Sequence, residues 1–209
     1  MPRQIPISSI TTSILNGFVE AQKTYELMSG GFWLWQAPEY FITSTVAKNI
    51  FNLEGSKFIT LEHGSSNAIE NAGAKGRGRL SRDIREKGKI DILLWWANDT
   101  PRAIIELKNQ IYSKGQYDKD IKRIKSFLER KNSKSTLQFG VFAFYESAST
   151  GAQKTAKEKI KARISNIYTN AQSILGTNYQ TSLITTDLYE ELTDNAWQAA
   201  CILVKFKNT

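Results

Sequence analysis

Residues 88–110, GKIDILLWWANDTPRAIIELKNQ, constrain the fold more than any other segment. The apolar runs 89–97 and 102–109 have the length and composition of strands, and the NDTP between them is typical of a hairpin turn. Both runs are apolar on both faces, so we expect their sheet to be covered on both sides. A chain built around this hairpin needs helices above and below it.

The flanking sequence predicts those helices and further strands. Apolar residues at helical spacing predict helices over 8–29, 38–52, 116–131 and 151–175, and short apolar runs predict strands over 57–63, 136–146, 180–188 and 196–206. Residues 64–88 have no apolar period and are predicted to form a long loop. The order strand, helix, strand from 102 to 146 implies a right-handed parallel crossover.

These elements predict an α/β fold with a mixed central sheet flanked by helices. A chain of 209 residues with 41% hydrophobic residues fits one compact domain over 1–209. It has no secretory signal pattern, no apolar run of about 20 residues and only one cysteine, Cys201, so we expect a cytoplasmic protein with no membrane partner. The net charge of +8 favours polyanionic partners, with nucleic acid first among them.

Three charged residues interrupt the apolar hairpin. Glu106 and Lys108 lie two apart, so on a strand they point to the same face, and Asp91 joins them if the turn holds an even number of residues. One interpretation is a structural salt bridge across the hairpin. Burying these charges costs several kcal/mol each, however, so a functional site is the favoured interpretation.

The chemistry of this trio suits a divalent cation and a phosphate. Carboxylates are ligands for Mg²⁺ or Mn²⁺, which can polarise a phosphodiester and lower the pKa of a water molecule. A lysine beside them could orient the attacking water and add positive charge. Zinc is not expected, because His63 is the only histidine in the chain.

The KID of residues 89–91 followed by IIELK at 104–108 resembles the bipartite motif of the PD-(D/E)xK, or restriction-endonuclease-like, nuclease superfamily. The resemblance implies an αβββαβ core over 36–146, with a helical extension over 1–30 and a C-terminal helix plus strands over 147–209. It also implies that Asp91 and Glu106 are metal ligands and that Lys108 is catalytic. The chain departs from the motif at Ile90, where the family name has proline.

The family often adds an acid from the first core helix, and Glu39 stands at the matching position. Independently, Glu39 lies three residues before Ile42 and seven before Val46, which places it on the inward stripe of its helix. The alternative is an acid that complements the helix dipole in the first turn. Glu62, at the end of the strand over 57–63, is a second candidate for the third acid.

Basic residues gather just before the strand that carries Asp91. Phosphate contacts are expected from five of them, which are Lys75, Arg77, Arg79, Arg82 and Arg85. The alternative is an ordinary solvated loop. Asp120 and Arg123 flank the apolar stripe of the helix over 116–131, where a pair three residues apart contributes little, so no catalytic role is predicted for them.

The resemblance therefore implies a Mg²⁺-dependent or Mn²⁺-dependent endonuclease that hydrolyses DNA, with restriction or phage defence as roles and RNA left open as a substrate. A homodimer would suit cleavage of both strands. The competing hypothesis is a catalytically inactive nuclease-like module that binds nucleic acid or a protein.

Overall fold

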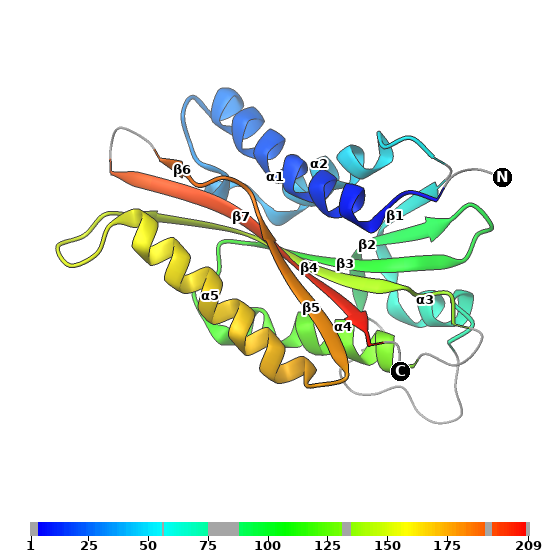
Figure 1. Ribbon diagram of the computed structural model, residues 1–209. Coiled ribbons are helices and arrows are strands. Elements are labelled where there is room, and N and C mark those ends of the chain that lie inside the picture. The colour runs from blue at the N-terminus through cyan, green and yellow to red at the C-terminus, as the bar shows by residue number, and fades with distance from the viewer. Residues whose placement is uncertain (1–3, 56, 75–87, 131–134, 191–193, 208–209) are drawn as a thin grey trace.

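The computed structural model describes residues 4–55, 57–74, 88–130, 135–190 and 194–207. Within these residues a seven-stranded open sheet runs through the molecule, with helices on both faces (Figure 1). Its strands are β1 (Lys57–Gly64), β2 (Lys89–Trp96), β3 (Pro101–Asn109), β4 (Phe139–Ser149), β5 (Tyr179–Thr185), β6 (Tyr189–Glu190) and β7 (Asn195–Phe206). Their order is β1-β2-β3-β4-β7-β5, with β6 paired to β7. Neighbouring strands of the described sheet are antiparallel except β3 and β4, which are parallel.

The helical elements form two layers. They are α1 (Ile7–Ser29), η1 (Leu34–Gln36), α2 (Glu39–Phe51), α3 (Ser65–Asn71), η2 (Lys114–Gln116), α4 (Asp118–Glu129) and α5 (Ala156–Leu175). The helices α1 and α2 share one apolar core with the sheet, and α3, α4 and α5 share the core on its opposite face. No helix in the described part of the chain is long and apolar enough to cross a bilayer.

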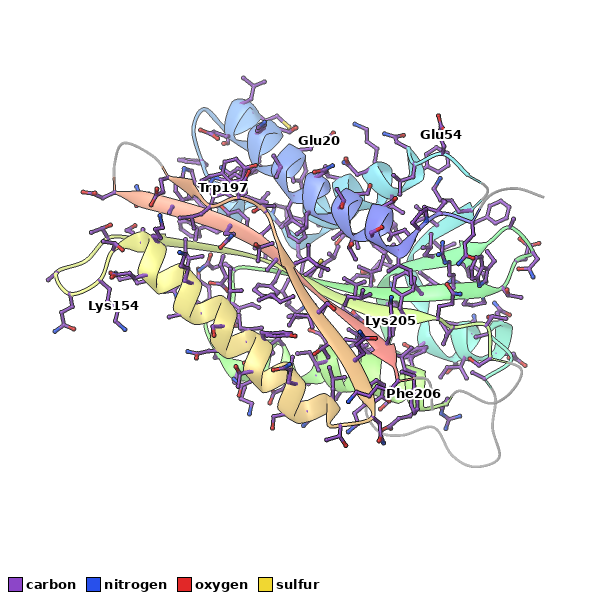
Figure 2. All side chains as sticks on the ribbon, viewed as in Figure 1. Glu20, Glu54, Lys154, Trp197, Lys205 and Phe206 are labelled. Carbon is purple, nitrogen blue, oxygen red and sulfur yellow. The ribbon has the colours of Figure 1, made fainter. Side chains whose placement is uncertain are left out.

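Strand β4 shows why the central strands are apolar on both faces. Val141 and Ala143 pack into the core under α1 and α2, whereas Phe142 and Phe144 pack against the other layer. Side chains fill both spaces between the sheet and its helices (Figure 2). The two-sided burial expected from the hairpin sequence is therefore confirmed, and it extends to the strands beyond it.

Two local features bring polar residues to the sheet. Pro38, in extended conformation, precedes α2 and makes Glu39 its first residue, with Ile42 and Val46 buried beneath the helix as predicted. On the opposite face, a Cβ at Gly140 of β4 would lie 2.4 Å from Ile124 Cγ2. Glycine here allows α4 to lie close against the strands, which places its inward polar residues beside β3.

The predicted element order is confirmed, including the parallel connection from β3 through α4 to β4. The loop predicted over 64–88 is wrong at its start, where α3 forms. This helix spans only seven residues, too few for an apolar period to show, and it is held by the burial of Ala68 and Ile69. The short strand β6 was not predicted either, because two residues carry no pattern.

Candidate active site

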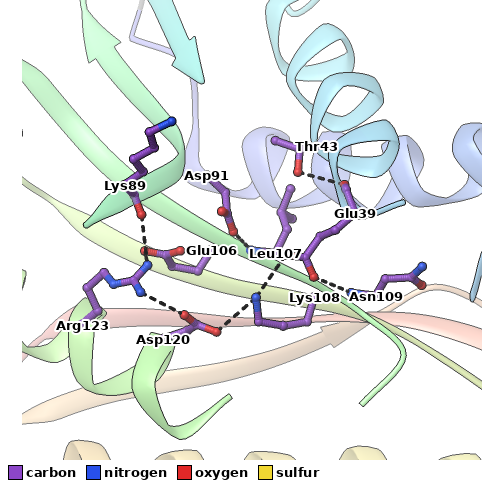
Figure 3. Close-up of polar contacts among 10 residues, drawn as sticks. All are labelled: Glu39, Thr43, Lys89, Asp91, Glu106, Leu107, Lys108, Asn109, Asp120 and Arg123. Carbon is purple, nitrogen blue, oxygen red and sulfur yellow. Dashed lines mark hydrogen bonds and ion pairs between the residues drawn. The ribbon is translucent and has the colours of Figure 1, made fainter. Parts of the chain in front are cut away.

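The candidate site lies where β2 and β3 cease to pair. Their ladder ends at Ile92 opposite Ile105, so the register continued by one residue sets Asp91 level with Glu106. The regular alternation of faces also breaks there, since Ile90 and Ile92 belong to opposite cores. The Asp91 carboxylate turns into the gap between the strands, and its Oδ2 accepts the Leu107 backbone N–H at 2.7 Å (Figure 3).

This geometry corrects one detail of the prediction. Asp91 is level with Glu106 as expected, but its side chain lies between the strands instead of on the face that Glu106 occupies. The pairing of β1 with β2 skips Asp91, and the skipped partner is Glu62, which has a positive φ of 52°. The irregularity of β1 at this point accompanies the reorientation of Asp91, and strand parity in the sequence does not reveal it.

Lys108 connects the two helical layers at the end of β3. Its Nζ lies 3.1 Å from Glu39 Oε1 on α2 and 3.4 Å from Asp120 Oδ2 on α4. Burial lowers the pKa of Lys108, but the charges of Asp120, Glu39 and Asp91 outweigh that effect and raise it above its ordinary value. Lys108 is therefore a cation at neutral pH, suited to attracting a phosphate.

Glu106 faces α4 and is 1% exposed. Its Oε1 accepts a hydrogen bond at 2.9 Å from Nη1 of Arg123, which also donates to the Lys89 carbonyl at 3.1 Å. Nη2 of Arg123 lies 3.4 Å from Asp120 Oδ1. Burial and the neighbouring charge of Asp91 raise the pKa of Glu106 well above its usual range, and Arg123 offsets only part of this.

Asp120 and Arg123 are thus part of the cluster, which the sequence analysis did not predict. Each directly precedes a buried isoleucine of α4, Ile121 and Ile124, so each lies at the border of the inward face. That position was visible in the sequence. Their partners were not, because the crossing of α4 over β3 decides which side chains they meet.

Asn109 positions the acid of α2. Its backbone N–H donates to Glu39 Oε2 at 3.3 Å, while its Nδ2 donates to the carbonyls of Leu34 at 2.8 Å and Ala37 at 2.9 Å. The segment that leads into α2 is thereby tied to the end of β3. This confirms that Glu39 lies beside Lys108, and it identifies Asn109 as a positioning residue that the sequence analysis did not name.

The other predicted residues lie elsewhere. Glu62 is exposed and forms an ion pair at 3.4 Å with Lys89, and no contact joins it to Lys108 in the described structure. The basic residues Lys75, Arg77, Arg79, Arg82 and Arg85 lie outside the described residues. Glu39 and Glu62 are the two candidates for the third acid of the site, and of these the structure brings Glu39 into contact with Lys108.

The charges of the cluster do not balance. Four carboxylates meet two cations, and the members are Asp91, Glu106, Glu39, Asp120, Lys108 and Arg123. Fully ionised, the cluster carries two excess negative charges, and burial raises the pKa of both Asp91 and Asp120. An oxygen-rich site with this excess fits a hard divalent cation. In the described structure no three acidic, histidine or cysteine side chains are grouped as a ligand set, since Glu106 and Glu39 turn toward Arg123 and Lys108.

Comparisons of the chain with protein-family models, with curated proteins and with solved structures give no significant match.

Proposed function

We propose that the protein is a metal-dependent nuclease that hydrolyses phosphodiester bonds of DNA, with RNA as the alternative substrate. The observation that carries the proposal is the junction of three elements around Lys108. The helix α2 supplies Glu39, β2 supplies Asp91 and α4 supplies Asp120, so acids distant in the sequence act on one lysine, and Glu106 lies two residues before it on β3. Such convergence of charged groups with shifted pKa values, as at Asp91, Asp120 and Lys108, is typical of functional sites.

The position of each residue suggests its role in the reaction. Asp91, Glu106 and Glu39 would hold a divalent cation, which polarises the phosphodiester and lowers the pKa of a water molecule when bound. Lys108, kept protonated by its acidic neighbours, contributes positive charge and hydrogen-bond donors toward the phosphate. Arg123 compensates the buried Glu106 and anchors it to α4.

The order of elements supports the same proposal. Helix α2, strands β1, β2 and β3, helix α4 and strand β4 follow the αβββαβ order of a restriction-endonuclease-like core, with α3 inserted after β1. Asp91 of the D…ExK pattern lies on β2, and Glu106 and Lys108 lie on β3. The positive net charge of +8 suits a polyanionic substrate.

The second candidate is a nuclease-like module that binds nucleic acid without cleaving it. The pairing of Lys108 with Glu39 and Asp120, and of Glu106 with Arg123, favours it, because the main charges already have partners within the protein. Such a module would bind in a salt-dependent manner and would be indifferent to EDTA.

Cleavage assays separate the two candidates. Purified protein is incubated with single-stranded DNA, duplex DNA and RNA in Mg²⁺, Mn²⁺ or EDTA. We expect cleavage in metal only, lowered about 100-fold to 1,000-fold in Lys108→Ala, since a donor to the reacting phosphate is lost. The matched control is Lys48→Ala, which removes an exposed lysine paired with Glu20 at the surface and should cleave like the parent protein.

Folding of each variant is checked by circular dichroism. A folded parent protein that cleaves none of the substrates in either metal contradicts the proposal and leaves the binding module. Cleavage by Lys108→Ala at the parental rate contradicts the assignment of the site.

A further inference from the structure

A second concave site opens beside the candidate active site. It is a pocket of about 430 Å³ at the ends of β3 and β4, between the segment that contains η1 and the start of α5. In Figure 1 the end of β4, the start of α5 and the end of α1 lie at the same end of the sheet. The volume lies within the range of small-molecule and cofactor sites, of about 300–1,000 Å³.

Exposed aromatic rings form the walls of this pocket. Trp35 of η1 is 43% exposed and Tyr112 is 70% exposed, and Trp33 contributes a third, partly buried ring. These rings surround one pocket and are not fully buried in the core. Their flat faces are therefore available to stack on a planar ligand. Stacking on such rings is how proteins bind unpaired bases.

The floor of the pocket is polar and held in place. The Gln110 amide is buried, with Nε2 donating to the Ser147 carbonyl at 3.1 Å and Oε1 accepting from the Ser147 N–H at 2.8 Å. Gln110 also has a positive φ of 37°, a conformation that these bonds maintain. Arg163 donates from Nη1 to the same Ser147 carbonyl at 2.9 Å, and its half-exposed guanidinium adds a cation at the wall.

The pocket is joined to the candidate active site through three consecutive residues. Lys108 lies in the cluster, Asn109 holds the carbonyls of Leu34 in η1 and of Ala37 just after it, and Gln110 lines the pocket. Two residues of extended chain cover about 7 Å, a distance that one nucleotide can bridge. The pocket is therefore next along the chain to the lysine at which a phosphate would lie.

We propose that this pocket binds an unpaired nucleobase of the strand whose adjacent phosphate lies at Lys108. The inference rests on the proposed function and specifies its substrate, because a base that is stacked in a duplex cannot enter. The protein should therefore prefer single-stranded nucleic acid, or a duplex with a nucleotide displaced from its stack. Arg163, whose guanidinium is half exposed, would contact the edge of the base that Trp35 and Tyr112 cover.

Binding in EDTA tests this without catalysis. Fluorescence anisotropy compares three labelled probes, which are a 12-residue oligothymidylate, the same backbone with abasic sites, and a blunt duplex. We expect the oligothymidylate to bind most tightly. The double variant Trp35→Ala/Tyr112→Ala should weaken its binding roughly 5-fold to 150-fold, as loss of base stacking does, while leaving the abasic probe unaffected.

Phe51→Ala is the matched control, because Phe51 is also an exposed aromatic residue of this layer but lies at the far end of α2, outside the pocket. It should bind all probes like the parent protein. Equal affinity of the parent protein for the abasic and base-bearing strands overturns the inference, and so does an equal loss in Phe51→Ala.

Failure of this inference can be distinguished from failure of the proposed function. If the protein cleaves nucleic acid in a Lys108-dependent way but binds abasic and base-bearing strands alike, only the pocket assignment is wrong. If base-dependent binding persists in Lys108→Ala while no protein cleaves, the pocket assignment stands and the nuclease proposal is wrong.

Discussion

Two acids on neighbouring strands, Glu106 of β3 and Glu146 of β4, are almost completely buried, and each faces an arginine. Burial raises the pKa of both, that of Glu146 to about 7. They differ in their other neighbours. Asp91 and Asp120 add negative charge around Glu106, whereas Glu146 accepts the Ile111 N–H at 3.0 Å and, among the described residues, has Arg163 as its charged neighbour.

The difference shows which buried acid is evidence for function. Glu146 ties the chain after β3 to β4 through its bond to the Ile111 N–H, and Arg163 is the cation beside it. Glu106 belongs to a group whose acids outnumber its cations, and mutual repulsion inside a protein is costly unless a bound cation or proton relieves it. Burial of an acid alone is therefore weaker evidence than burial of several acids together.

The largest expected effect is the loss of stability when Arg123, the partner of Glu106, is replaced. Arg123→Met should lower the free energy of unfolding by about 3–5 kcal/mol, because it leaves a buried carboxylate without its cation. Arg163→Met should cost only about 1 kcal/mol, since Arg163 is half exposed, lies 3.5 Å from Glu146 and leaves the Ile111 bond intact. Urea unfolding at pH 7.5 measures both, and equal losses would contradict the distinction.

The next effect is a pH dependence that belongs to Glu146. Its pKa rises from 4.5 to about 7 on folding, so between these values the folded protein holds a proton that the unfolded chain releases. Glu146 therefore contributes roughly 3 kcal/mol to the free energy of unfolding below about pH 4.5. This contribution is lost as the pH rises through 7.

Between pH 5 and pH 8 the free energy of unfolding in urea should fall less in Glu146→Gln than in the parent protein, because the variant lacks this titrating group. The fall in stability that remains in the variant reports Glu106, whose raised pKa also lowers stability as the pH rises. A variant whose stability falls between these two pH values as much as that of the parent protein would show that Glu146 is ionised throughout.

The smallest effect is produced by metal. Mn²⁺ at 100 times its dissociation constant should stabilise the protein by about 2.7 kcal/mol, seen as a higher Tm in a thermal scan. The shift should disappear in Glu106→Gln and persist in Glu146→Gln, because only the first acid lies among the proposed ligands. A shift of equal size in both variants would place the metal elsewhere.

Local pattern predicted much of this molecule. The hairpin, the two-sided burial, the parallel connection through α4 and the inward position of Glu39 all follow from periods of two or 3.6 residues. The same patterns failed where structure is short or irregular, at α3 and at Asp91, whose side chain leaves the alternation of β2. Periodicity cannot report a break that a neighbouring strand imposes.

The sequence by itself determined the long helices and strands, and that Glu106 and Lys108 share the end of one strand. Only the tertiary structure decided that Arg123 compensates Glu106, and that Trp35 and Tyr112 line one pocket. The physical reason is the distance along the chain over which each kind of interaction acts. Strand and helix periods arise from backbone geometry over a few residues, whereas ion pairs and pockets depend on how elements distant in the chain cross and how closely they pack.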